Sequence, residues 1–251
     1  MTKVIQNDES MIPEGVIAIR LHGQGADRPW HDVGNNSAGT LNVTTESRNL
    51  PNYRGGGGNR NRSTKISEVT AAFTMYDLSP ENIARALRGT QSEVPITPIV
   101  DELLTASGIV GEVLAFKYLP NRTETITVKT AADAALVEGT DYALTPHGIS
   151  VQSSLVTAAG LKVSYTPAAG DVVDLLVGSD QVWEVRLLGT NAAQDDKPFK
   201  YNIWKAKFNI AGSLALIADT YAELPVVLNV LVDDTVDESG LAKFAKYSAV
   251  R

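Results

Sequence analysis

Apolar and polar residues alternate one by one in several stretches of the chain. In Val69–Met75 the odd-numbered positions are apolar, and Thr70 and Thr74 lie between them. The segments Val182–Leu188 and Ile203–Ile210 show the same alternation, with charged residues on the second face. Because successive side chains of a β-strand point to opposite faces, this period of two predicts strands with one buried and one hydrated face.

Shorter apolar runs predict further strands, and together they indicate a mainly β protein. These runs are Gly15–Leu21, Val110–Tyr118, Glu124–Val128, Ile149–Gln152, Leu161–Thr166, Val172–Val177, Val226–Val232 and Lys243–Val250. All-β folds of this length often form one unit. We therefore expect a single domain over residues 1–251, with a small β insertion at residues 119–167.

Only one helix has clear signals at both ends. Ser79 suits an N-cap, Pro80 suits the first helical position, and Gly89 suits the end of the helix. A second, short helix is expected over Thr130–Leu136. Two prolines interrupt Val94–Leu104, so the pattern there leaves helix and strand both open.

The stretch Trp30–Lys65 is long and polar, with one short β-like run at Thr40–Thr45. Long loops without regular structure in a compact domain are usually functional or disordered. We interpret this stretch as an arm that becomes ordered only against a neighbouring subunit. The residues expected to make that contact are Asn52, Tyr53, Arg54, Gly55, Gly56, Gly57, Gly58, Arg60 and Arg62.

Charge indicates what this arm contacts. The formal net charge is −7, which argues against a general nucleic-acid binder. The arm is locally basic, so its arginines could follow a phosphate backbone or meet an acidic surface on another copy of the chain. We favour protein contact because the chain as a whole is acidic. The acidic partner loop is expected to contain Asp233, Asp234, Asp237 and Glu238.

Motifs for catalysis, metals or cofactors are missing. The chain has no cysteine, and its histidines His22, His31 and His147 lack the spacing of a metal site. The four glycines are not followed by Gly-Lys-Ser/Thr, so a phosphate-binding loop is not predicted. The acidic loop does not match the EF-hand pattern. We therefore expect no enzyme, no metal and no cofactor.

The tryptophans and the apolar runs give two further expectations. Trp183 and Trp204 stand on the apolar faces of their strands, so core packing is the default, whereas Trp30 is expected to anchor the base of the long loop. No apolar run is long enough to span a membrane, and the N-terminus lacks the apolar segment of a signal peptide.

The chain also contains a series of short motifs whose order is informative. These are Trp30, Val33–Asn35, Leu41–Thr45, Leu50–Tyr53 with the glycines, Tyr76–Ser79, Pro80–Gly89, Gly139–Tyr142, Val163–Thr166, Lys197–Ile210 and Asp219–Leu224. This order resembles the tail tube proteins, or major tail proteins, of long-tailed bacteriophages. The helix segment with its preceding leucine and serine is the closest match.

The resemblance implies a twisted β-sandwich or barrel with one flanking helix and a long extended arm. In that family six copies close into a ring, the inner sheets line a channel, and the rings stack through long loops or arms. The implied partners are further copies, the tape-measure protein, and the tail-tip and tail-terminator proteins. Double-stranded DNA would pass through the channel without specific contacts. The implied location is the virion, after synthesis in the host cytoplasm.

Three alternatives stay open. A tube of a contractile injection or secretion machine is a close variant of the same reading. A β-sandwich module for carbohydrate binding or adhesion would need Trp183 or Trp204 on an exposed face. A β-fold hydrolase would use a pair of carboxylates, which sequence does not exclude.

Overall fold

The computed structural model describes residues 9–23, 29–236 and 242–250, and over these ranges it contains sixteen strands and one helix. The mainly β prediction is confirmed. The chain forms two compact units, one of Met1–Thr90 with Asp174–Arg251 and one of Gln91–Val173. The insertion predicted at residues 119–167 of a single domain lies inside the second unit. No helix among the described residues is long and apolar enough to cross a membrane.

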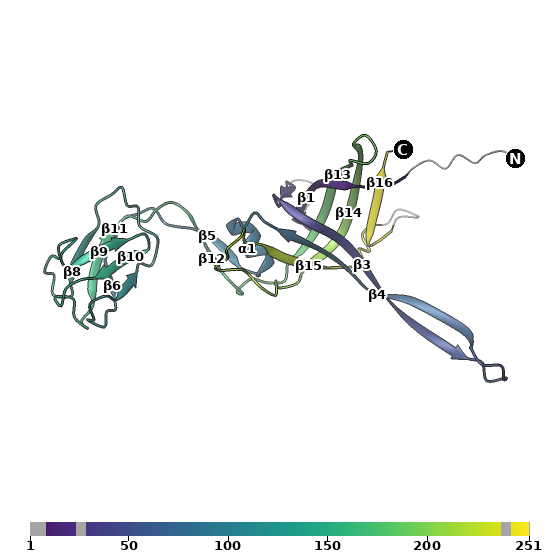
Figure 1. Ribbon diagram of the computed structural model, residues 1–251, viewed down its shortest axis with the longest axis horizontal. Helices are drawn as coiled ribbons and strands as arrows, with labels where there is room; N and C mark the ends of the chain where they lie inside the picture. The colour runs from purple at the N-terminus through teal and green to yellow at the C-terminus, as the bar shows by residue number, and fades with distance from the viewer. Residues whose placement is uncertain (1–8, 24–28, 237–241, 251) are drawn as a thin grey trace. The chain divides into compact units, whose positions relative to one another are not determined.

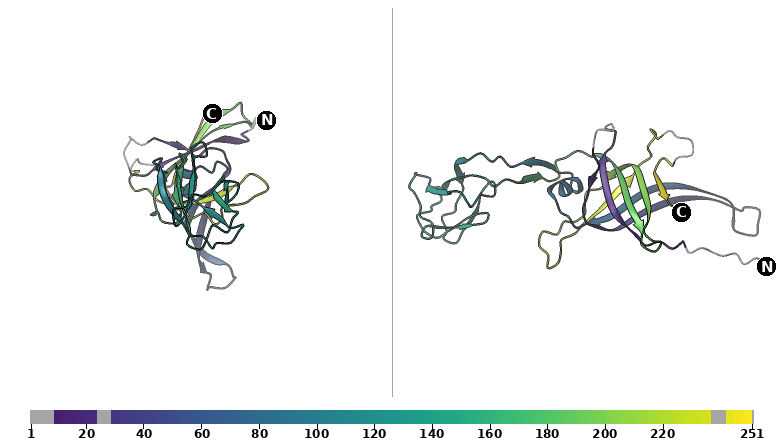
Figure 2. Two further views of the ribbon diagram at one scale, coloured as in Figure 1. Left: turned by 90° about the vertical axis from the view of Figure 1, so that its left-hand side faces the viewer. Right: turned by 90° about the horizontal axis from the view of Figure 1, so that it is seen from above.

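An eight-stranded antiparallel sheet forms the first unit (Figure 1). The order is β2-β1-β13-β14-β15-β4-β3, and β16 pairs with the remaining length of β14. The bounds are β1 Pro13–Leu21, β2 His31–Asp32, β3 Asn36–Pro51, β4 Asn59–Met75, β13 Val182–Asn191, β14 Lys197–Phe208, β15 Leu224–Val230 and β16 Ala245–Ala249. The sheet is strongly curved, as Figure 2 shows from above. Strands β1 and β3 stand near opposite ends of the strand order. Both nevertheless line one cavity of about 390 Å³ on the inner face of the sheet.

The core of this unit follows the alternation of the sequence. Val69, Ala71, Phe73 and Met75 of β4 are all buried, as predicted. They pack with the inward-facing residues of β1, β13, β14 and β15. Burial of these apolar side chains is the main source of the unit's stability.

Helix α1, Pro80–Ala86, flanks the sheet and has the predicted start. The Ser79 side chain accepts a hydrogen bond from the Asn82 backbone N–H at 3.2 Å. The buried Asn82 side chain donates to the carbonyl oxygens of Val33 at 2.9 Å and Asp77 at 2.8 Å. These bonds fix α1 against the segment that leads into β3.

The long polar stretch is not a structureless loop, so the expectation that it becomes ordered only against a neighbouring subunit was wrong, whereas the contact with another copy stays a prediction. β3 and β4 form a hairpin that is paired from Asn36 opposite Met75 to Pro51 opposite Asn59. β15 pairs with β4 only through Thr70–Met75 of that strand. The outer half of the hairpin therefore satisfies its backbone hydrogen bonds with its own two strands and extends away from the sheet (Figure 1).

The second unit has its own sheets and core. Its sheets have the orders β7-β10-β9 and β6-β11-β8, and β5 pairs with β12 where the chain enters and leaves the unit. The bounds are β5 Thr90–Glu93, β6 Ile99–Leu104, β7 Val113–Ala115, β8 Thr127–Thr130, β9 Tyr142–Thr145, β10 Gly148–Val151, β11 Leu161–Tyr165 and β12 Asp171–Asp174. Ile149, Leu161 and Val163 are fully buried at its centre.

The short helix expected over Thr130–Leu136 is absent. The backbone N–H of Thr130 bonds to Ala134 O at 2.8 Å, and that of Leu136 bonds to Val128 O at 3.0 Å. The segment is thus a turn that folds back on the end of β8. Seven residues with helix-forming composition form no stable helix alone, and pairing with β8 prevails over their local propensity.

Candidate functional site

The outer half of the hairpin, here called the ribbon, is the most exposed regular structure in the first unit. It comprises Thr45–Pro51 and Asn59–Ile66, joined by the turn Asn52–Gly58. Nearly every residue in it is exposed. Leu50, Tyr53 and Ile66 are exposed by 49%, 83% and 55%, so the ribbon presents apolar as well as charged side chains.

The turn at the end of the ribbon has a defined geometry that needs its glycines. The Asn52 N–H bonds to Gly58 O at 2.9 Å, and the Asn52 side-chain amide donates to Gly55 O at 2.7 Å. All four residues of Gly55–Gly58 have positive φ, between 69° and 92°. Residues with a Cβ rarely adopt that backbone region, so four successive glycines permit this turn.

Most cations of the ribbon form no ion pair with the described part of the chain. Arg48 reaches Glu46 at 3.9 Å, and Arg62 donates to the Ser47 hydroxyl at 2.9 Å. Among the described residues, Arg54, Arg60 and Lys65 form no ion pair. These three side chains are therefore available to a carboxylate on another molecule.

The residues of the predicted acidic partner loop do not share one environment in the structure. Asp233 is 4% exposed and accepts hydrogen bonds from the Thr235 N–H at 3.0 Å and hydroxyl at 2.6 Å. Asp234 is paired with Lys243 at 2.9 Å. Asp237 and Glu238 lie outside the described residues. Both described carboxylates thus already have partners within the chain.

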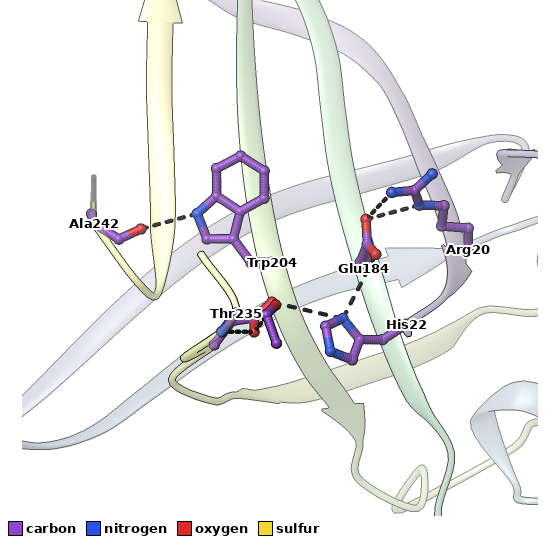
Figure 3. Close-up of polar contacts among 7 residues, drawn as sticks. Arg20, His22, Glu184, Trp204, Thr235 and Ala242 are labelled. Atoms are coloured by element: carbon purple, nitrogen blue, oxygen red, sulfur yellow. Dashed lines mark hydrogen bonds and ion pairs between the residues drawn. The ribbon is translucent and has the colours of Figure 1, made fainter. Parts of the chain in front are cut away.

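Asp233 belongs to a polar cluster at the end of β1 (Figure 3). Nδ1 of His22 lies 3.6 Å from a Glu184 oxygen and 3.8 Å from an Asp233 oxygen. Arg20 holds the other oxygen of Glu184 with Nε at 2.8 Å and Nη2 at 2.6 Å. Arg20 and Glu184 form an ion pair, and the His22 ring lies near both Glu184 and Asp233, so the cluster places the 231–236 segment beside the end of β1.

The described residues include no cluster of metal ligands. No group of three or more histidines, cysteines or carboxylates there could hold a metal ion. His31 and His147 are exposed.

The pKa of Asp233 gives this cluster a pH dependence. Burial raises the pKa of the Asp233 carboxyl. The two hydrogen bonds from Thr235 and the charges of His22 and Lys205 lower this pKa by a larger amount, so the net shift is downward. A carboxyl whose pKa is lower in the folded chain stabilises the fold above its unfolded pKa, and this stabilisation is lost as pH falls through the folded value.

We therefore expect Thr235→Val to make the first unit more sensitive to acid. Loss of the hydroxyl raises the folded pKa of Asp233 and lowers the free energy of unfolding at pH 7 by about 1 kcal/mol. Urea unfolding followed by tryptophan fluorescence between pH 7 and pH 3 measures this. Thr235→Ser, which keeps the hydroxyl, is the control. Identical acid profiles for the two variants would contradict the role given to this bond.

The tryptophans occupy three different environments. Trp183 is buried in the core against Phe208. The prediction that Trp204 shares that core was wrong. The pairing of β13 with β14 shifts at a β-bulge between Trp183 and Val185, and the inward-facing positions of β14 change there from odd to even numbers. Trp204 is half-buried outside the core cluster, and its Nε1 donates to Ala242 O at 2.9 Å (Figure 3).

Trp30 packs between two arginines. The guanidinium carbon of Arg186 lies 4.0 Å from the ring centroid, and that of Arg20 lies 4.7 Å from it. Such cation–π contacts hold the residue before β2 against β1 and β13. Both contacts reduce the free ring area that a sugar would need.

One exposed surface was not predicted from the sequence pattern: the β14–β15 loop, residues 209–223. Leu216, Ile217 and Tyr221 are exposed by 87%, 96% and 92%. The run of apolar residues in this loop was visible in the sequence. Without a period of two or of 3.6, however, no pattern distinguished exposure from burial.

Comparison with known proteins identifies a family but no activity. A family model described as Protein of unknown function UCP028589 matches residues 10–248. No curated protein matches the chain.

Proposed function

The chain belongs to the family described as Protein of unknown function UCP028589, and we propose that its members are structural subunits of a phage tail tube. In this proposal, copies of the chain form stacked hexameric rings around a channel. The tape-measure protein fills the channel during assembly, the tail-tip and tail-terminator proteins bound the tube, and the genome later passes through it. The tail-tube form of the β fold is part of the proposal.

The ribbon is the observation that carries this proposal. A two-stranded ribbon isolated in water is marginally stable at best. This one exposes Leu50, Tyr53 and Ile66, with unpaired cations beside them. A surface of this kind is suited to burial against another protein.

The edges of the sheet support self-assembly as well. Among the described residues, β3 pairs only with β4 and β16 pairs only with β14, so each has one free edge. Free edges invite pairing with another chain, and closure into a ring removes them. The overall charge of −7 suits a channel that repels DNA rather than binding it.

The carbohydrate-binding alternative has less support. Trp183 is buried, and the Trp204 indole N–H is already bonded to Ala242 O. Trp183 therefore has no open face for stacking on a sugar, and Trp204 is partly covered.

Negative-stain electron microscopy of the purified chain, beside size-exclusion chromatography with light scattering, tests the proposal. Hollow tubes or six-fold rings are expected as concentration rises or when tail-tip proteins are added. A chain that remains monomeric under all these conditions would overturn the tube assignment.

A further inference from the structure

Both ends of the β14–β15 loop are held by hydrogen bonds and by packing on the core. At its start, the Asn209 N–H bonds to Val227 O at 2.8 Å, and the side chains of Asn209 and Asn229 bond to each other. The Ala211 N–H bonds to Ala86 O at 2.9 Å, and Leu214 packs on the core. Leu224, directly after the loop, is fully buried.

The side chains that this loop exposes most are large and apolar. Leu216, Ile217 and Tyr221 lie within six positions of one another and are each at least 87% exposed. Exposed apolar side chains that gather in this way mark an interaction site. The same loop carries the exposed carboxylates Asp219 and Glu223, which form no ion pair with the described residues.

The charged residues of the β14–β15 loop are all acidic. The sequence contains no lysine or arginine between Lys207 and Lys243. The ribbon is the complement, because it combines exposed apolar residues with the unpaired cations Arg54, Arg60 and Lys65. The loop thus offers carboxylates, and the ribbon offers the cations that can pair with them.

The ribbon and the loop stand at opposite ends of the same strand. The ribbon turn precedes Asn59, the first residue of β4, whereas the loop leads into Leu224, which pairs with Met75, the last residue of β4 (Figures 1 and 2). β4 has 17 residues, so these ends are about 50 Å apart at roughly 3.3 Å per residue. The two surfaces of one chain therefore do not meet.

We infer that the ribbon of one copy docks on the β14–β15 loop of a second copy. Apolar contact is made by Tyr53 and Leu50 with Ile217 and Tyr221, and Asp219 and Glu223 pair with ribbon cations. Contact between different surfaces of identical chains is heterologous, and each added copy leaves a free ribbon and a free loop. The inference rests on the proposed self-assembly and names the surface that receives the ribbon.

Chemical cross-linking tests the contact directly, because the chain has no cysteine of its own. Tyr53→Cys and Ile217→Cys chains are mixed and treated with a short bismaleimide. A cross-linked pair that contains one of each variant is expected. Tyr53→Cys mixed with Leu155→Cys, an exposed position in the second unit, is the control and is expected to give no such product. Equal yields from both mixtures would overturn the docking.

Charge reversal tests the pairing. Asp219→Lys/Glu223→Lys is expected to raise the concentration needed for assembly by roughly tenfold or more, and adding Arg54→Glu/Arg60→Glu to the same chain is expected to recover most of that loss. Glu124→Lys/Glu138→Lys, exposed carboxylates in the second unit, applies the same charge change away from the loop.

The outcomes separate the two proposals. If the wild-type chain assembles and the loop variant assembles equally well, only the ribbon–loop docking is overturned. If the wild-type chain never assembles, the tube assignment and the docking both fall.

Discussion

Replacement of Ser47–Thr64 by Asn-Gly is expected to leave the first unit folded and to abolish assembly. Glu46 and Lys65 are paired across the hairpin, so a two-residue turn joins them without a change of register. Asn-Gly is the preferred sequence for such a turn. The removed residues include none of the core cluster, so the free energy of unfolding should change by less than about 1 kcal/mol.

Circular dichroism and light scattering of the shortened chain measure fold and assembly separately. Ser47→Ala/Thr64→Ala is the control, because it removes the cross-strand contact between the two hydroxyls at 3.3 Å and keeps the full ribbon. This control should still assemble. Tubes or rings from the shortened chain would show that the ribbon is dispensable, and an unfolded product would contradict its independence from the core.

Core truncation is expected to have the largest effect on stability, and the effect should stay within one unit. Leu228 and Ile149 are each fully buried, in the first and second core respectively. Replacement of either residue by alanine should cost about 2–5 kcal/mol. A loss of this size is a large share of the stability of an ordinary domain.

The tryptophans make this test selective. Trp30, Trp183 and Trp204 all lie in the first unit, and the second unit has no tryptophan. Urea unfolding followed by tryptophan fluorescence should therefore shift for Leu228→Ala and remain unchanged for Ile149→Ala. Hydrogen exchange should show the converse loss of protection, in β10 and β11. An equal fluorescence shift for both variants would mean that the two units unfold together.

Local signals in the sequence predicted the elements whose residues face a core. The alternation in Val69–Met75 predicted the buried face of β4, and the capping signals at Ser79 and Pro80 predicted the start of α1. Burial of one face leaves a period in the sequence, and an N-cap needs a particular side chain at one position. Such features are readable without knowledge of distant contacts.

The ribbon could not be predicted in the same way. Both faces of β3 are exposed along most of its length, so selection for burial left no alternation there. The four glycines did not reveal how the flanking strands pair, because that pairing depends on contacts across the hairpin. The displacement of Trp204 likewise comes from one bulge in the pairing of β13 with β14, which no local pattern encodes.

The sequence indicated a β insertion at residues 119–167 but not the bounds of the second unit, Gln91–Val173. Strand signals continue through residues 91–173 in the same style as before and after. Which strands share a core depends on pairing between segments far apart in the chain. Of the acidic residues expected to meet the arm, Asp233 is used internally for a similar reason, since His22 reaches it from a distant strand end.

The pairing of β5 with β12 has a consequence for protein engineering. Val94 N–H bonds to Gly170 O at 2.9 Å, so the chain leaves the first unit and returns to it at adjacent points. A foreign domain whose own termini lie side by side could replace the residues between these points while the flanking backbone keeps its path. This junction is therefore a natural grafting point, at which an enzyme or an antigen could be displayed once on every copy of the chain.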